Sequence, residues 1–176
     1  MKKILKLANN KSKFVVLVLV TIAVFALWQG GMQVYHAKML VGTTNIFLGI
    51  TGSKNHVAYE MENEDPIFKM QIVVDGRKAS FPQKIGALLQ PTVMILAWQL
   101  FLFFVLDTKQ ALRLFLINSV SFFLIQVFFL LQLMGYYTSE FNKFMYEFLK
   151  SSFYVIALIF VIKDNLLYLV FRRNPV

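Results

Sequence analysis

Side chains capable of acid–base or metal chemistry are few in this sequence. Cysteine is absent, which excludes thiolate metal ligands and a cysteine nucleophile. The two histidines are His36 and His56, and a group of acidic residues follows the second. These acids are Glu60, Glu62, Glu64 and Asp65. His56 and Glu60 share a face in an extended segment, while the other acids fall in a turn. We therefore expect a solvated acidic loop, with no metal site and no cofactor.

A hydrolytic triad can be assembled only from Ser53, His56 and Asp75. No strained turn or oxyanion-hole signature surrounds the serine, so the combination carries no weight. An enzyme or lipid-handling protein working at the outer membrane interface stays open as an alternative. It would use His56, Glu60 or Arg77.

Polar residues also interrupt the apolar runs of the sequence, at Gln99, Asn118, Ser121, Gln126 and Gln132. They predict either a buried polar site or hydrogen bonds between neighbouring helices, and we favour the hydrogen bonds. Replacing Asn118 by Leu should then cost about 1 kcal/mol or less. Arg113 is interpreted as an ordinary interfacial arginine.

The elements that must position these residues are four long apolar stretches. They run over Phe14–Trp28, Ala87–Leu106, Leu112–Met134 and Phe144–Ile162, and 58% of the 176 residues are hydrophobic. A bilayer core of about 30 Å takes about 20 helical residues. The sequence thus predicts an all-α membrane fold with four transmembrane helices and a small extracytoplasmic α/β-hairpin insertion between helices 1 and 2.

The insertion is expected to hold one helix and two strands. In residues 33–50 the apolar residues are spaced three or four positions apart, which favours a helix along the membrane face. Gly49 and Gly52 are expected to end this helix. Residues 56–61 and 67–74 alternate, which indicates a β-hairpin. Ser80 and Pro82 are typical of a helix start and predict that the second span begins there.

One face of this hairpin is the predicted partner-binding surface. It consists of Tyr59, Met61, Phe68, Met70, Ile72 and Val74. Two strands alone cannot protect such a face from water, so either the helix over 33–50 or another subunit must cover it.

The positive charges indicate topology, not nucleic-acid binding. The net charge is +9, but the lysines form no single stripe. Five of them precede the first span, namely Lys2, Lys3, Lys6, Lys11 and Lys13. This asymmetry predicts a multi-pass plasma (inner) membrane protein with both termini cytoplasmic and the first apolar stretch kept as an uncleaved anchor.

The end of the last span has two interpretations. A span over 151–171 puts Lys163 and Asp164 near mid-bilayer, where the insertion of each charge costs about 2.5–3.5 kcal/mol. A span over 144–162 leaves both charges at the cytoplasmic surface, and this cheaper arrangement is preferred. The amphipathic segment 136–150 then approaches the span along the interface.

The C-terminal half resembles a known group. In hydropathy, and over about sixty residues, it is similar to the small membrane proteins of the exosortase and archaeosortase group and their associated proteins. The similar stretch is Arg113-Leu-Phe-Leu-Ile-Asn118, a span, a Gly-Tyr loop, Phe141-Asn-Lys-Phe144 and a last span. Those enzymes use Cys, Arg and His, whereas this chain has no Cys, Ser121 in place of the Arg, and Glu147 but no His near the last span. The resemblance implies a non-catalytic relative or companion.

These observations together favour a non-enzymatic accessory, assembly or scaffold subunit of a cell-envelope complex. Its expected parts are residues 1–32 (cytoplasmic N-terminus and helix 1), 33–85 (extracytoplasmic) and 86–176 (helices 2–4 and an interfacial tail). Its expected partners are membrane lipids and other membrane subunits. A small oligomeric channel or transporter subunit is a further alternative.

Overall fold

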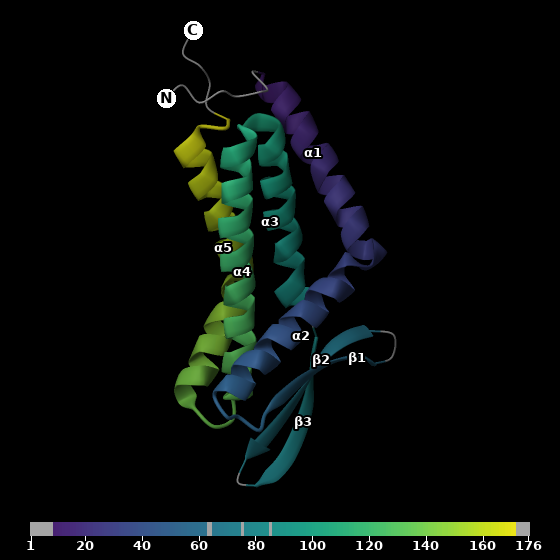
Figure 1. Cartoon of the computed structure of the whole chain (residues 1–176), viewed down its shortest axis with the longest axis vertical. Coiled ribbons are helices and arrows are strands. Elements are labelled where there is room, and N and C mark those ends of the chain that lie inside the picture. Colours follow the sequence, from purple (N-terminus) through teal and green to yellow (C-terminus); the bar gives the residue numbers. More distant parts are fainter. Residues whose placement is uncertain (1–8, 63–64, 75, 85, 172–176) are drawn as a thin grey trace. The chain divides into compact units, whose positions relative to one another are not determined.

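The computed structural model describes residues 9–62, 65–74, 76–84 and 86–171, leaving aside the side chains of Asp65, Val74 and Ala87. The helices are α1 (Asn10–Leu27), α2 (Gln33–Ile50), α3 (Gly86–Val105), α4 (Thr108–Met134) and α5 (Glu140–Tyr168). The strands β1 (His56–Glu62), β2 (Asp65–Val74) and β3 (Arg77–Lys84) lie between α2 and α3 in the chain (Figure 1).

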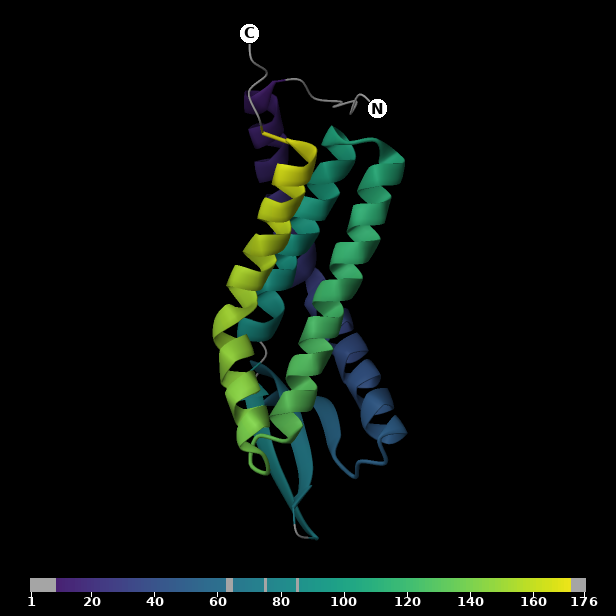
Figure 2. The same ribbon diagram turned by 90° about the vertical axis from the view of Figure 1, so that its left-hand side faces the viewer.

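The chain divides into two compact units. The first comprises the described residues of Met1–Gly30, Pro91–Phe122 and Tyr154–Val176. The second comprises those of Gly31–Gln90 and Phe123–Phe153. In the first unit the segments of α3, α4 and α5 run side by side (Figures 1 and 2). The second unit contains α2 and the sheet.

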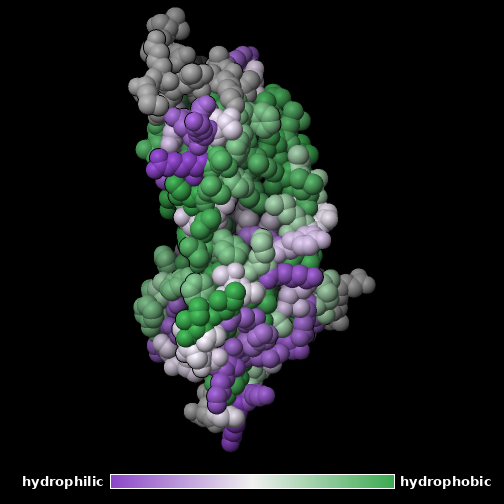
Figure 3. Space-filling view, in the orientation of Figure 1, coloured by the Kyte–Doolittle hydropathy of each residue, from purple (hydrophilic) through white to green (hydrophobic). Residues whose placement is uncertain are grey.

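Among the described residues, four helical segments are long and apolar enough to cross a membrane. They are Asn10–Ile50, Leu88–Val105, Thr108–Met134 and Glu140–Tyr168. Figure 3 shows mostly hydrophobic residues over the helices and hydrophilic residues gathered over the sheet. The four predicted apolar helices are therefore confirmed as helices. The last differs from the prediction, because α5 runs without a break from the expected interfacial segment to Tyr168.

Glycines lie at two helix boundaries, Gly31 between α1 and α2 and Gly52 after α2. Trp28–Met32 forms a wide π-type turn between α1 and α2, and Gly31 adopts φ 118°, a value that side chains disfavour. The predicted helix over 33–50 is confirmed as α2. It stops at Gly52 (φ 67°), where the Gly52 and Ser53 amides donate to the carbonyls of Gly49 and Leu48. This is a Schellman cap.

The sheet has three antiparallel strands in the order β1-β2-β3, so the predicted two-stranded hairpin is incomplete. The expectation that Ser80 and Pro82 open a helix is wrong, because Arg77–Lys84 pairs with β2 and α3 begins only at Gly86. The register sets Phe81 opposite Met70 and so extends the apolar face. Pro82 is tolerated because β3 is an edge strand.

Much of the apolar sheet face is buried within the chain itself. Phe68, Met70 and Ile72 are almost fully buried, Tyr59 is partly buried, and Met61 is 60% exposed. The side chain of Val74 lies outside the described part. Helix α2 packs against the edge strand β1. Among the described side chains of the predicted partner surface, Met61 is the most exposed and thus the most accessible to a partner.

Asn45 fastens the sheet to α2. Its Nδ2 donates to the Val57 carbonyl (2.8 Å) and its Oδ1 accepts from the Val57 amide (2.9 Å). One side chain thus satisfies both main-chain groups of Val57, a buried residue of the edge strand β1.

We predict that Asn45→Ala lowers the free energy of unfolding by about 1–3 kcal/mol, because two main-chain groups of β1 lose their partner. Thermal unfolding in detergent measures this loss. Thr43→Ala, on the same helix, is the matched control and should stay within about 0.5 kcal/mol of the parent. Equal melting of the two variants would argue against the fastening role.

Candidate functional site: a buried carboxylate network

The central residue of the candidate site is Asp164. It belongs to α5, which continues through Lys163 and Asp164 to Tyr168, and its exposed fraction is 0%. The preferred prediction, a span ending at Ile162 with both charges at a surface, is therefore wrong for Asp164. The helix continues because residues 166–171 are again apolar, and the carboxylate finds partners inside the bundle.

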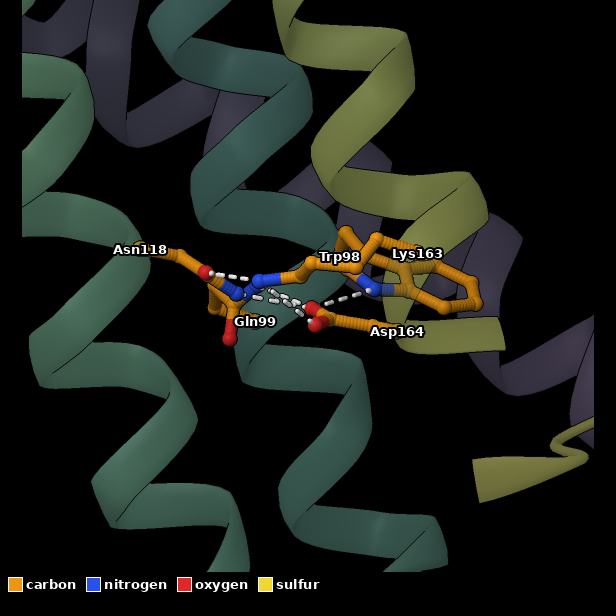
Figure 4. A network of polar contacts seen from close by, with 5 residues as sticks. All are labelled: Trp98, Gln99, Asn118, Lys163 and Asp164. Atoms are coloured by element: carbon orange, nitrogen blue, oxygen red, sulfur yellow. Dashed lines mark hydrogen bonds and ion pairs between the residues drawn. The ribbon is translucent and has the colours of Figure 1, made fainter. Parts of the chain in front are cut away.

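Three side-chain donors converge on one oxygen of this carboxylate. Oδ2 accepts from Trp98 Nε1 (3.2 Å), Gln99 Nε2 (2.9 Å) and Asn118 Nδ2 (2.8 Å), as Figure 4 shows. Two donors come from α3 and one from α4, so the carboxylate ties α5 to both helices. Convergent donors of this kind complement a negative charge in an apolar surrounding.

Lys163 and Asn118 complete the network. Lys163 Nζ lies 3.3 Å from Asp164 Oδ1, an ion-pair distance, and donates to Asn118 Oδ1 at 2.7 Å. The side-chain amide of Asn118 thus accepts a hydrogen bond from the Lys163 ammonium and donates one to the Asp164 carboxylate. In this way Asn118 bridges the two charges. The Lys163 side chain is 39% exposed and its ammonium lies 5.1 Å from the centre of the Phe160 ring.

The indole of Trp98 is held by aromatic neighbours. Its ring centre lies 5.4 Å from that of Phe101 and 6.3 Å from that of Phe171. The rings of Phe101 and Phe171 stack on each other at 5.8 Å. The turn that follows α5 therefore helps to place one of the three donors.

Helix α1 holds this turn from the other end of the sequence. Lys13 is 1% exposed, and its Nζ donates to the Val170 carbonyl at 2.7 Å. Asn10 Nδ2 donates to the Phe171 carbonyl at 3.4 Å. A cation at the carbonyl end of a helix is favourable. Lys13, one of the five lysines that precede the first span, is therefore buried and clamps α1 to the turn after α5.

The carboxylate at the centre of the network is enclosed, and this limits what it can do. Asp164 is fully enclosed, and its described partners all come from the chain itself. Within the network, two buried acceptors have no hydrogen bond to a described residue, Asp164 Oδ1 and Gln99 Oε1. An arrangement of this kind fixes helix positions, because removing one member leaves a charge or a donor unpaired.

The residues that an outer-interface enzyme would use are not brought together. By strand register His56 and Glu60 lie on one face of the sheet, opposite Gln71 and Ile67, whereas Arg77 pairs with Val74 on the other. Glu60 pairs with Lys69 at 2.9 Å. No metal-binding group of three occurs among the described residues, and Glu64 and Asp75 lie outside them.

Gln126 also bonds to residues outside its own helix, whereas Gln132 Oε1 is buried without a hydrogen bond to a described residue. Gln126 donates to the Leu88 carbonyl at 2.7 Å, and its Oε1 lies 2.9 Å from His36 Nε2. Gln99 and Asn118 bond across helices as predicted, but to a carboxylate and, for Asn118, also to an ammonium. The prediction did not include Trp98, Lys163 or Asp164 among these bonds. Gln99 and Asn118 lie about two to three turns from the loop at Asp107, on either side of it, so the sequence could have indicated that these two residues lie at a similar level of adjacent helices.

Comparisons with protein families, curated proteins and solved structures give no match for this chain.

We predict that Asn118→Leu lowers the free energy of unfolding by about 2–3 kcal/mol, more than the 1 kcal/mol expected for one neutral helix–helix bond. The reason is that both Asp164 and Lys163 lose a hydrogen-bond partner. Ser121→Ala, on the same helix, should change it by less than about 0.5 kcal/mol. Thermal unfolding in detergent compares the two, and equal stability of the variants would contradict the bridging role of Asn118.

Proposed function

We propose that this chain is a multi-pass plasma-membrane scaffold or assembly subunit of a cell-envelope complex, without catalytic activity of its own. The observation that carries the proposal is the complete burial of Asp164 among its hydrogen-bond donors. A catalytic or transporting carboxylate must be reached by its substrate, whereas Asp164 has no exposed surface. Its bonds to α3 and α4 instead stabilise one arrangement of the helices.

The resemblance to the exosortase and archaeosortase group fits the same proposal. Asn118 matches the pattern, while the cysteine is absent from the sequence, Ser121 stands in place of the arginine, and no histidine lies near the last span. Asn118 here holds the charges of Asp164 and Lys163. A relative that keeps the helices and has lost the nucleophile suits a companion subunit better than an enzyme.

The proposed topology places both termini in the cytoplasm and residues 33–85 outside. Because the chain has no cysteine, single cysteines report on it cleanly. We expect Ser53→Cys to react with a membrane-impermeant maleimide in intact cells, and Ser12→Cys only after permeabilisation. The reverse labelling pattern would contradict this orientation.

The accessory role predicts a protein partner at the exposed part of the sheet. Met61→Cys, carrying a thiol-linked photocrosslinker, should give one discrete adduct with another membrane protein in native membranes. Phe68→Cys is the matched control, because Phe68 is fully buried opposite Tyr59 and should not react in the folded chain. If Met61→Cys gives no protein adduct, or Phe68→Cys gives the same one, the partner surface is wrong.

A further inference from the structure

A pocket of about 270 Å³ lies within the second unit. Its walls come from the end of β3, the end of α4 with the turn after it, and the first turns of α5. Tyr136, Tyr137, Tyr146 and Phe81 supply aromatic surface, and Glu147 and Lys150 supply the charges. We call it the tyrosine pocket.

The aromatic side chains are held by one another and by the sheet. Phe81 meets Tyr137 edge to face at 5.5 Å, and Tyr136 meets Tyr146 in the same way at 5.2 Å. The Tyr146 hydroxyl donates to Gln83 Oε1 at 2.9 Å. The pocket is thus built before any ligand arrives, which lowers the entropic cost of binding.

Two opposite charges line this pocket one helical turn apart. Glu147 and Lys150 are exposed on the same face of α5. The Tyr136 hydroxyl donates to Glu147 Oε1 at 3.3 Å, and Lys150 Nζ lies 5.6 Å from the centre of the Tyr146 ring. A carboxylate beside tyrosine rings attracts an ammonium group, and the lysine attracts a phosphate.

We propose that the tyrosine pocket binds the headgroup of a zwitterionic phospholipid of the phosphatidylethanolamine class. Its ammonium lies against Glu147 and the tyrosine rings, and its phosphate against Lys150. The ligand is a lipid because Phe141, Phe144 and Phe148 are 64%, 65% and 54% exposed on the same turns of α5. Phe144 lies one turn from Glu147, so this stripe offers acyl chains a surface beside the pocket.

The test is native mass spectrometry of the full-length protein in detergent, titrated with phosphatidylethanolamine or phosphatidylglycerol. We expect Glu147→Gln and Tyr137→Ala to weaken phosphatidylethanolamine binding about five- to tenfold. Glu147→Gln should leave phosphatidylglycerol binding unchanged, because that lipid has no ammonium. Lys150→Gln should weaken the binding of both lipids.

Glu140→Gln and Lys143→Gln are the matched controls, since these charges lie on the same helix but not among the lining residues of the pocket. Both should bind like the parent. Equal loss in the controls, or unchanged binding in Glu147→Gln and Tyr137→Ala, would overturn the proposal. Displacement of the lipid by equimolar soluble phosphoethanolamine would reassign the site to a free headgroup. Glu147 is exposed, so Glu147→Gln folds, and its melting temperature verifies this.

Discussion

A carboxylate buried among apolar helices must be surrounded by donors, and the first unit is arranged around this requirement. Asp164 receives three donors on one oxygen and an ammonium beside the other. Removing the carboxylate would leave those donors unpaired, and removing a donor would leave a buried charge with fewer hydrogen bonds. The packing of α3, α4 and α5 in this unit is therefore specified by polar contacts as well as by shape.

In the second unit it is main-chain amides and carbonyls that need hydrogen-bond partners. Its sheet is small and has two edges, and edge strands expose unpaired amides and carbonyls. Asn45 satisfies both groups of Val57, and Asn55 accepts from the Val73 amide at 2.9 Å. Asn45 thus replaces the hydrogen bonds of a further strand at the edge of β1, and Asn55 continues the bonding of the central strand β2 beyond the start of β1. The apolar face of the sheet is largely buried inside the chain.

Helices were predictable from the sequence because apolar runs and glycine stops are local signals, as with α2 and its cap at Gly52. The third strand was not, since Ser80 and Pro82 carry a helix-start signal that the pairing of Phe81 with Met70 overrides. The site was predictable only in part. Gln99 and Asn118 stood out as polar residues in apolar runs, but the burial of Asp164 depends on donors that are about 45 to 65 residues away in the chain.

The clamp at Lys13 joins the two ends of the described chain, and the network joins its last helix to earlier ones. Trp98, Gln99 and Asn118 all precede Asp164 in the sequence. A chain synthesised from its N-terminus therefore contains all three donors before their acceptor emerges from the ribosome. The order is reversed for Lys13, whose acceptor at Val170 is made 157 residues later, so the carboxylate can be paired as soon as it is made but the buried ammonium must wait for the end of synthesis.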